Sequence, residues 1–244
     1  MPATPARPPR SLPRLFVPPP LGEGVLVALN GAQANYLGAV LRLGAGGEVL
    51  LFDGANGEWH STVVEAGKKR MSLAVGRQTR PQEAVPALTL AFAPVKKGRV
   101  DWLVEKAVEL GVAHLQPVIT QRTIVDKLNL ERMRSHVVEA AEQCGRTALA
   151  TIDAPVKLEA FLRGLVGTLY FADETGGAPA ASTFMPGVAT ILTGPEGGFT
   201  SDEAAAIRAT PGAIAISLGP RILRAETAAL AAVTAWMAAV GDWG

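Results

Sequence analysis

The sequence predicts an α/β protein in which a small β-barrel precedes a larger domain built on a mostly parallel sheet. From Arg14 to about Arg80, short apolar runs are separated by glycine turns, which is typical of a barrel of short strands. Beyond the proline-rich stretch 81–86 (PQEAVP), strand-like runs alternate with helical stretches, as in parallel sheets. With 244 residues, 48% of them apolar, the chain has enough material for two domains.

The first 13 residues predict a disordered tail, because they hold five prolines, two arginines and no acid. We therefore expect the barrel at 14–82 and the larger domain at 83–244. A helical piece around Ala32–Leu43 interrupts the barrel strands. The apolar runs expected to form those strands are 25–29 (VLVAL), 48–54 (EVLLFDG), 58–64 (EWHSTVV) and 71–75 (MSLAV).

The larger domain is expected to alternate strands and helices to its end. Glycines that suit left-handed caps, Gly111 and Gly145, end two of the helices, and Thr200 with Glu203 forms a capping box at the start of another. The expected strands are 88–94, 115–119, 168–173, 188–194 and 213–218, and the expected helices are 100–110, 131–144 and 225–240.

Composition excludes several classes of protein. Cys144 is the only cysteine, so no intrachain disulfide can form, and the three histidines show no metal-ligand spacing. We expect no metal. The sequence also contains neither a membrane-spanning apolar stretch nor an apolar signal core, which predicts a soluble cytoplasmic protein.

Charge is unevenly distributed although the net charge is only +1. Residues 66–100 carry eight lysines and arginines against the single acid Glu83. Such a run is either a solvated surface or a local basic face that contacts an anionic partner.

Two loops in the last third each follow an apolar strand: 193–199 (TGPEGGF) and 218–227 (LGPRILRAET). Glycine at a strand end lets the backbone approach a ligand, and proline stiffens the loop. Neither loop has the lysine of a Walker motif or GxGxxG spacing, so phosphate and dinucleotide sites are disfavoured. Either loop alone could be a structural turn, but together they predict a cleft at the carboxyl ends of the strands.

LTGPEGGF at 192–199 and LGPRILRAETA at 218–228 resemble the two signature segments of the RsmE family of SPOUT RNA methyltransferases. The resemblance covers nearly the whole chain. Further matching segments are RLF at 14–16, VLRL at 40–43, FDG at 52–54, EKAVELGV at 105–112 and EAAEQCGR at 139–146.

The resemblance implies a PUA-like barrel followed by an α/β domain whose C-terminal chain forms a deep trefoil knot. It also implies a homodimer whose partner subunit completes the active site. S-adenosylmethionine is then held mainly by backbone groups of two segments: Leu192, Thr193, Gly194, Pro195, Glu196, Gly197 and Gly198 in one, and Leu218, Gly219, Pro220, Arg221, Ile222, Leu223 and Arg224 in the other.

The reaction that the family implies is methylation of N3 of a uridine in 16S (small-subunit) ribosomal RNA during ribosome assembly. This nitrogen carries a proton that must leave, so a cation near the uracil oxygens and a proton acceptor are needed. Arg224 or Arg146 could be the cation, and Glu196 or Glu226 the acceptor. Each residue has an alternative role: phosphate contact or bracing of the knot for Arg224, RNA contact from the partner subunit for Arg146, bonding to backbone amides of its loop for Glu196, and helix-dipole stabilisation for Glu226.

The resemblance also suggests an RNA-binding surface on both domains. Two alternatives to the main function stay open: methylation of another RNA position, and a non-catalytic RNA-binding assembly factor. The residues expected to contact RNA are Arg14, Arg42, Lys68, Lys69, Arg70, Lys96, Lys97, Arg99 and Arg122.

Overall fold

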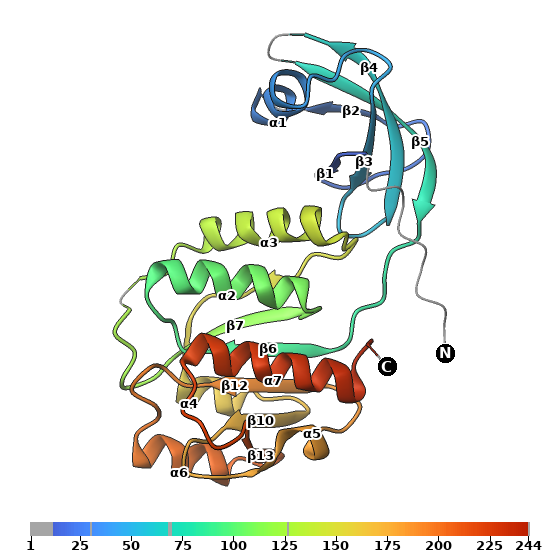
Figure 1. The fold of residues 1–244 in the computed structure, drawn as a ribbon. Helices are drawn as coiled ribbons and strands as arrows, with labels where there is room; N and C mark the ends of the chain where they lie inside the picture. Colours follow the sequence, from blue (N-terminus) through green and yellow to red (C-terminus); the bar gives the residue numbers. More distant parts are fainter. Residues whose placement is uncertain (1–11, 30, 68–69, 126, 244) are drawn as a thin grey trace. The chain divides into compact units, whose positions relative to one another are not determined.

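The computed structural model describes residues 12–29, 31–67, 70–125 and 127–243, and the tail predicted at 1–13 lies almost wholly outside them. The chain divides into two units (Figure 1). The first comprises the described residues up to Ala84 together with Ala141–Leu149, and the second comprises Val85–Ala140 and the described residues from Ala150 onward. The division near 84 falls close to the proline-rich stretch.

The first unit is a five-stranded mixed sheet in the order β1-β3-β4-β5-β2. β1 pairs in parallel with β3, and the other neighbours are antiparallel. The elements are β1 (Arg14–Phe16), β2 (Leu26–Leu29), α1 (Gly31–Asn35), the π-helical turn η1 (Tyr36–Val40), β3 (Glu48–Phe52), β4 (Glu58–Ala66) and β5 (Met71–Arg80).

The helical piece expected at 32–43 is therefore shorter, and half of it is a π-helix. Apolar spacing predicts that a segment is helical, but it does not distinguish an α-turn from a π-turn. Arg42 follows with a φ of 57°, in the left-handed region that non-glycine residues rarely adopt.

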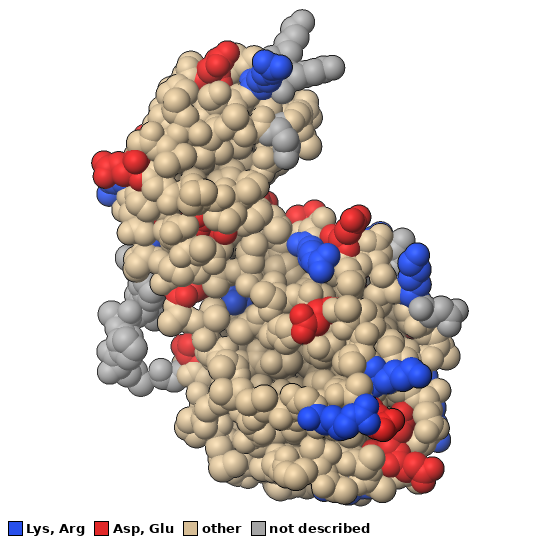
Figure 2. All heavy atoms as spheres, turned by 180° about the vertical axis from the view of Figure 1, so that it is seen from behind, with Lys and Arg blue, Asp and Glu red and all other residues tan. Residues whose placement is uncertain are grey.

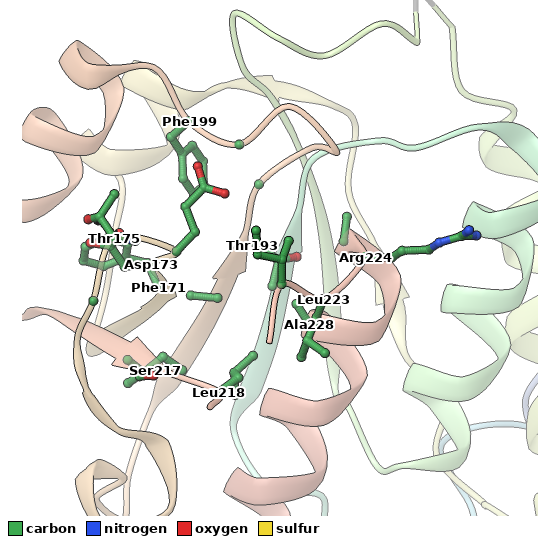
Figure 3. Close-up of a pocket in the computed structure, with 18 of the residues that line it drawn as sticks. Phe171, Asp173, Thr175, Thr193, Phe199, Ser217, Leu218, Leu223, Arg224 and Ala228 are labelled. Carbon is green, nitrogen blue, oxygen red and sulfur yellow. Dashed lines mark hydrogen bonds between the residues drawn. The ribbon is translucent and has the colours of Figure 1, made fainter. Parts of the chain in front are cut away.

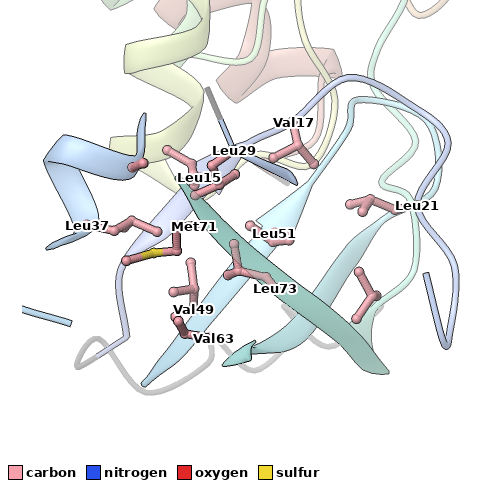
Figure 4. Close-up of a cluster of buried hydrophobic side chains, with 12 residues drawn as sticks. Leu15, Val17, Leu21, Leu29, Leu37, Val49, Leu51, Val63, Met71 and Leu73 are labelled. Carbon is pink, nitrogen blue, oxygen red and sulfur yellow. The ribbon is translucent and has the colours of Figure 1, made fainter. Parts of the chain in front are cut away.

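One face of this sheet forms a continuous apolar core (Figure 4). Leu51 and Leu73 are fully buried, and Met71 is 2% exposed. Alternate residues of β5 point into this core, which is the period-2 pattern expected for a strand with one buried face.

A charged residue is buried beside that core. Glu58 of β4 has no exposed surface, and its carboxylate accepts hydrogen bonds from Arg14 Nε (2.6 Å) and Arg80 Nη2 (2.8 Å). The two arginines also donate to backbone carbonyls of Ala141 (2.6 Å) and Gly145 (2.7 Å), respectively. This network attaches the segment 141–149 to the first unit.

The second unit carries an eight-stranded sheet in which the order β11-β13-β10-β12-β6-β7-β8 is continuous and β9 pairs with β7. Every strand pairing described in it is parallel. The elements are β6 (Leu88–Phe92), α2 (Lys97–Glu109), β7 (His114–Ile119), α3 (Leu130–Cys144), β8 (Thr151–Ile152), β9 (Val156–Lys157), α4 (Leu158–Arg163), β10 (Thr168–Ala172), β11 (Ala178–Pro179), α5 (Ala180–Thr183), β12 (Ala189–Thr193), α6 (Ser201–Ala209), β13 (Ala213–Ser217) and α7 (Ala225–Val240).

The long elements predicted from the sequence are confirmed, although α2 begins three residues earlier than the predicted start at Val100. The short elements α4, α5, β8, β9 and β11 were not predicted. They are too short for apolar periodicity to show.

Both faces of this sheet are covered. Leu169 and Phe171 of β10 belong to an apolar cluster with Leu158 of α4 and Ile207 of α6. Tyr170 points to the other face, where its ring packs edge-on against Phe184 at 4.9 Å. On that face α7 contacts β12, β10, β6 and α2 (Figure 1).

No helix in the described part of the chain is long and apolar enough to cross a membrane.

Candidate active site

A cavity of about 460 Å³ lies at the carboxyl ends of β10, β12 and β13 (Figure 3). β10 lies between β12 and β13 in the sheet, so the loops that follow these strands meet at one edge. This is the edge at which parallel α/β sheets bind ligands, and the volume suits a small-molecule site. The cavity is lined by residues of three segments, 171–176, 193–199 and 216–225, together with Ala204 and Ala228.

The loop after β12 is held in a close turn. Gly198 adopts a φ of +68° and donates its N–H to the Pro195 carbonyl at 2.9 Å. A Cβ atom at Gly194 would lie 3.2 Å from the Phe199 ring, so that ring occupies the space a side chain would need. The positive φ favours glycine at position 198, whereas a side chain at position 194 would require the Phe199 ring to shift.

The side chain of Arg122 binds backbone carbonyls of the same loop. Its Nη1 atom donates to the carbonyls of Gly197 (2.5 Å) and Phe199 (3.4 Å). Arg122 was predicted to contact RNA, whereas the structure shows its guanidinium bound to the loop that lines the cavity.

The predicted capping box is confirmed at the start of α6. The Thr200 hydroxyl accepts from the Glu203 N–H, and the Glu203 carboxylate accepts from the Thr200 N–H. The other oxygen of Glu203 accepts from the Gln121 N–H at 2.7 Å. The cap therefore also joins the start of α6 to the chain after β7.

The loop after β13 leads directly into α7. Gly219 has a φ of +105°, and Arg224 is the N-cap residue of α7. Ile222 is 92% exposed, an unusual position for an aliphatic side chain. In Figure 3 the Arg224 side chain extends away from the other labelled residues.

The third segment, after β10, was missed by the sequence analysis. The Asp173 carboxylate accepts from the Thr175 N–H (2.9 Å) and hydroxyl (2.7 Å) and forms a short ion pair with Arg208 of α6. Burial alone would raise the pKa of Asp173, but hydrogen bonds from Thr175 and the Arg208 charge hold it below its usual value. A glycine-containing turn after a buried strand, DETGG at 173–177, was the signal that could have revealed it.

The predicted cofactor residues fall largely on the cavity. Those that line it are Thr193, Gly194, Pro195, Glu196, Gly198, Leu218, Gly219, Pro220, Arg221, Ile222, Leu223 and Arg224. Leu192 is buried within β12, and neither it nor Gly197 is among the lining residues.

The predicted catalytic residues occupy different places. Glu196 and Arg224 line the cavity. Arg146 belongs to the segment grouped with the first unit, where it is 7% exposed and its Nε lies 3.3 Å from Glu83 Oε1. Within one chain, the described lining of the cavity does not include it.

Arg99, which was also predicted to contact RNA, forms two ion pairs at the cavity. Its Nη1 atom lies 3.3 Å from Glu196 Oε1, and its Nε atom lies 3.5 Å from Glu226 Oε1. These carboxylates come from the two segments that the sequence analysis singled out.

Among the other predicted RNA-binding residues, Arg14 is largely buried within the first unit. Its side chain is 11% exposed, binds Glu58 and lies over the Phe52 ring at 4.5 Å. Arg42, Arg70 and Lys96 are exposed. Lys68 and Lys69 lie outside the described residues, as does the side chain of Lys97. On the face shown in Figure 2, basic and acidic side chains are interspersed.

The described residues contain no cluster of three or more histidine, cysteine or acidic side chains that could hold a metal ion.

Residues 81–237 match the family model described as the RNA methyltransferase domain, and residues 29–75 match the RNA methyltransferase PUA domain. The ribosomal RNA small subunit methyltransferase E of Rickettsia conorii is 30% identical over 226 residues, 90% of this chain and 93% of that protein. The chain belongs to the ribosomal RNA small subunit methyltransferase E family. The protein of that name from Synechocystis is 33% identical, over 88% of this chain and 74% of its own length.

Solved structures agree with this membership. Ribosomal RNA small subunit methyltransferase E of Neisseria gonorrhoeae, solved bound to S-adenosyl methionine, superposes with a TM-score of 0.87. It is 30% identical, and the match covers 96% of this chain and all of that one. A Legionella pneumophila structure in complex with the bound cofactor SAM has a TM-score of 0.83 and 30% identity, over 95% of this chain and 99% of that one.

Proposed function

We propose that this protein transfers a methyl group from S-adenosylmethionine to N3 of a uridine in 16S ribosomal RNA. The observation that carries the proposal is the cavity at the ends of β10, β12 and β13, where both signature segments meet. Family membership and the cofactor-bound relatives support the cofactor and the class of substrate. A ribosomal RNA substrate would place the protein in the cytoplasm.

The residues around the cavity fit the proposed cofactor. Phe171, Phe199 and Leu223 provide apolar walls, while Asp173, Thr175 and Ser217 contribute polar groups. A few polar groups in a largely apolar cleft are what a small organic ligand requires. We assign cofactor binding to residues 192–198 and 218–224 and add the segment 171–176. When bound, S-adenosylmethionine supplies the methyl group from its sulfonium.

Side chains of this protein would then stabilise the negative charge that develops on the uracil and accept the proton from N3. Arg224 is an exposed cation at the rim of the cavity, suited to stabilising negative charge on the uracil oxygens. Glu196 lines the cavity and its side chain is 32% exposed, and the carboxylate oxygen that is not bound to Arg99 would accept the N3 proton. Positioning of the two reactants supplies much of the remaining acceleration.

We further propose that 14–82 is the RNA-docking domain, 83–244 the methyltransferase domain, and the active form a homodimer acting during ribosome assembly. Among the predicted RNA contacts, Arg42, Arg70 and Lys96 are exposed, as contact with phosphate groups requires. Arg14 is left out of this surface because its guanidinium is bound inside the first unit.

The test is mass spectrometry of nucleosides from small ribosomal subunits that lack the modification, after incubation with the protein and isotopically labelled S-adenosylmethionine. We expect labelled 3-methyluridine. A different labelled nucleoside would keep the cofactor and discard the acceptor. Absence of label, with the protein shown to be folded, would favour a non-catalytic assembly factor.

Replacing Arg224 with alanine tests its assigned role. Because the arginine is proposed to act on the uracil, we expect methyl transfer to fall about 100-fold while cofactor affinity changes by less than about threefold. Single-turnover methyl transfer and calorimetric titration with S-adenosylmethionine measure the two quantities. Equal turnover in variant and wild type would remove Arg224 from the mechanism.

A further inference from the structure

Arg99, in the first turn of α2, lies between two carboxylates, one from the loop after β12 and one from the start of α7. Its guanidinium is 3.3 Å from Glu196 in the loop after β12 and 3.5 Å from Glu226 at the start of α7. Glu196 lines the cavity, and Glu226 directly follows lining residues Arg224 and Ala225. One side chain from outside both segments thus pairs with both of them.

The carboxylate of Glu226 is buried, and the positive charge of Arg99 compensates its negative charge. Its side chain is only 9% exposed, and its Oε2 atom is buried with no hydrogen-bond partner among the described residues. A buried carboxylate is costly unless a positive charge or hydrogen-bond donors compensate it. The N-terminus of α7 supplies part of this compensation, and Arg99 supplies a full positive charge.

The loop after β12 is therefore anchored at two points. Arg122 binds its backbone at Gly197, and Arg99 binds its side chain at Glu196. Of these two arginines, Arg99 also pairs with Glu226 at the start of α7, directly after the loop that follows β13. Without its charge, the buried carboxylate would lack its cationic partner and the two loops would lose their shared contact.

We infer that Arg99 is a positioning residue for cofactor binding: by pairing with Glu196 and Glu226, it holds the two loops in the arrangement that forms the cavity. The inference rests on the proposed function. It assigns Arg99 to the cofactor site, in place of the RNA contact that the basic run in the sequence suggested.

The first measurement is calorimetric titration of Arg99→Gln with S-adenosylmethionine in the absence of RNA. We expect affinity to fall by roughly tenfold or more, because the charge-assisted hydrogen bond to Glu196 and the ion pair with Glu226 are both lost. Arg99→Lys keeps the charge and should recover part of the affinity. Arg163→Gln is the matched control, since it removes an exposed arginine that pairs with Glu159 on α4, away from both cavity loops, and its affinity should equal that of wild type.

A second substitution separates charge compensation from a general loss of structure. In the Arg99→Gln background, Glu226→Gln removes the uncompensated buried charge and should restore cofactor affinity by about threefold or more. If Glu226→Gln restores nothing, the proposed charge compensation is wrong. Thermal unfolding of each variant confirms that the titrated protein is folded, and Arg99→Lys remains informative should Arg99→Gln fail to fold.

The inference also fails if Arg99→Gln binds S-adenosylmethionine as wild type does and loses only RNA affinity, because Arg99 would then be an RNA contact. Failure of the proposed function would look different: wild-type protein itself would bind no S-adenosylmethionine, or would label no uridine.

Discussion

At the scale of single residues, an arginine can bind RNA or can bind groups within the protein, and the sequence does not reveal which role a given arginine has. Arg14, Arg99 and Arg122 all looked like candidates to bind RNA. The structure pairs the first with a glutamate 44 positions away, the second with two carboxylates and the third with backbone carbonyls. These partners are distant in sequence, so local charge patterning carries no information about them.

Glu58 provides a prediction at this scale. Burial alone would raise the pKa of its carboxyl, but hydrogen bonds from Arg80 and Arg14, together with their charges, hold it below the usual value of 4.5. A lowered pKa in the folded state means that the stabilisation is present above the unfolded value and is lost as the pH falls through the folded one. We therefore expect Glu58→Gln to lower the free energy of unfolding at pH 7 by about 3 kcal/mol.

Urea unfolding from about pH 7 down to about pH 3 measures this dependence. The difference between wild type and Glu58→Gln should shrink as the pH falls below about 4.5. Glu65→Gln, an exposed position on the same strand, serves as the control and should follow wild type. A difference that stays constant over the whole range would show that charge plays no part in the contribution of Glu58.

At the scale of elements, predictions succeed where the determinant is local. Thr200 and Glu203 are three residues apart, and their capping box forms as the sequence predicts. The additional bond from Glu203 to the Gln121 N–H spans 82 positions and left no sequence signal. The loops after β12 and β13 were found because glycine and proline directly follow apolar strands, whereas the loop after β10 was missed because its acidic turn resembled ordinary surface.

Substituting valine for Gly194 tests the loop after β12. The new Cβ would lie 3.2 Å from the Phe199 ring, so the loop or the ring must shift beside the cavity. Overpacking of this kind costs about 1–3 kcal/mol, and we expect the affinity for S-adenosylmethionine to fall about tenfold. Gly44→Val is the control, because a Cβ at Gly44 meets no other atom within 4 Å. Unchanged calorimetric affinity in Gly194→Val would refute the placement of this loop at the cofactor.

At the scale of the whole molecule, alternation of strands and helices predicts the parallel sheet but not its strand order. β13, a late strand, lies between β10 and β11, and β6 lies between β12 and β7. These strands are similar short apolar runs, so their neighbours are set by helix packing and loop connections that no single segment encodes. The same limit applies to the attachment of 141–149 to the first unit, which depends on the buried Glu58 network.

The proposed homodimer makes its own prediction, because a partner subunit that completes the active site would allow two defective chains to repair each other. Arg224 lines the cavity of its own chain, whereas Arg146 does not line it, so we expect Arg146 to act on the partner's site. Arg224→Ala and Arg146→Ala should each have little activity alone. In the mixed dimer, one site would contain both native arginines and the other neither.

When the two variants are refolded together, random pairing gives about half of the dimers one chain of each kind. Each of these mixed dimers has one intact site of two, so about a quarter of the wild-type methyl-transfer activity should be recovered. The measurement is transfer of labelled methyl groups to small ribosomal subunits, with sedimentation equilibrium confirming dimers of the 25.4 kDa chain. The control is the same two variants mixed without unfolding, which should stay inactive if subunits do not exchange. Mixed dimers that form and remain inactive would place both arginines at the site of a single subunit, or remove Arg146 from the reaction.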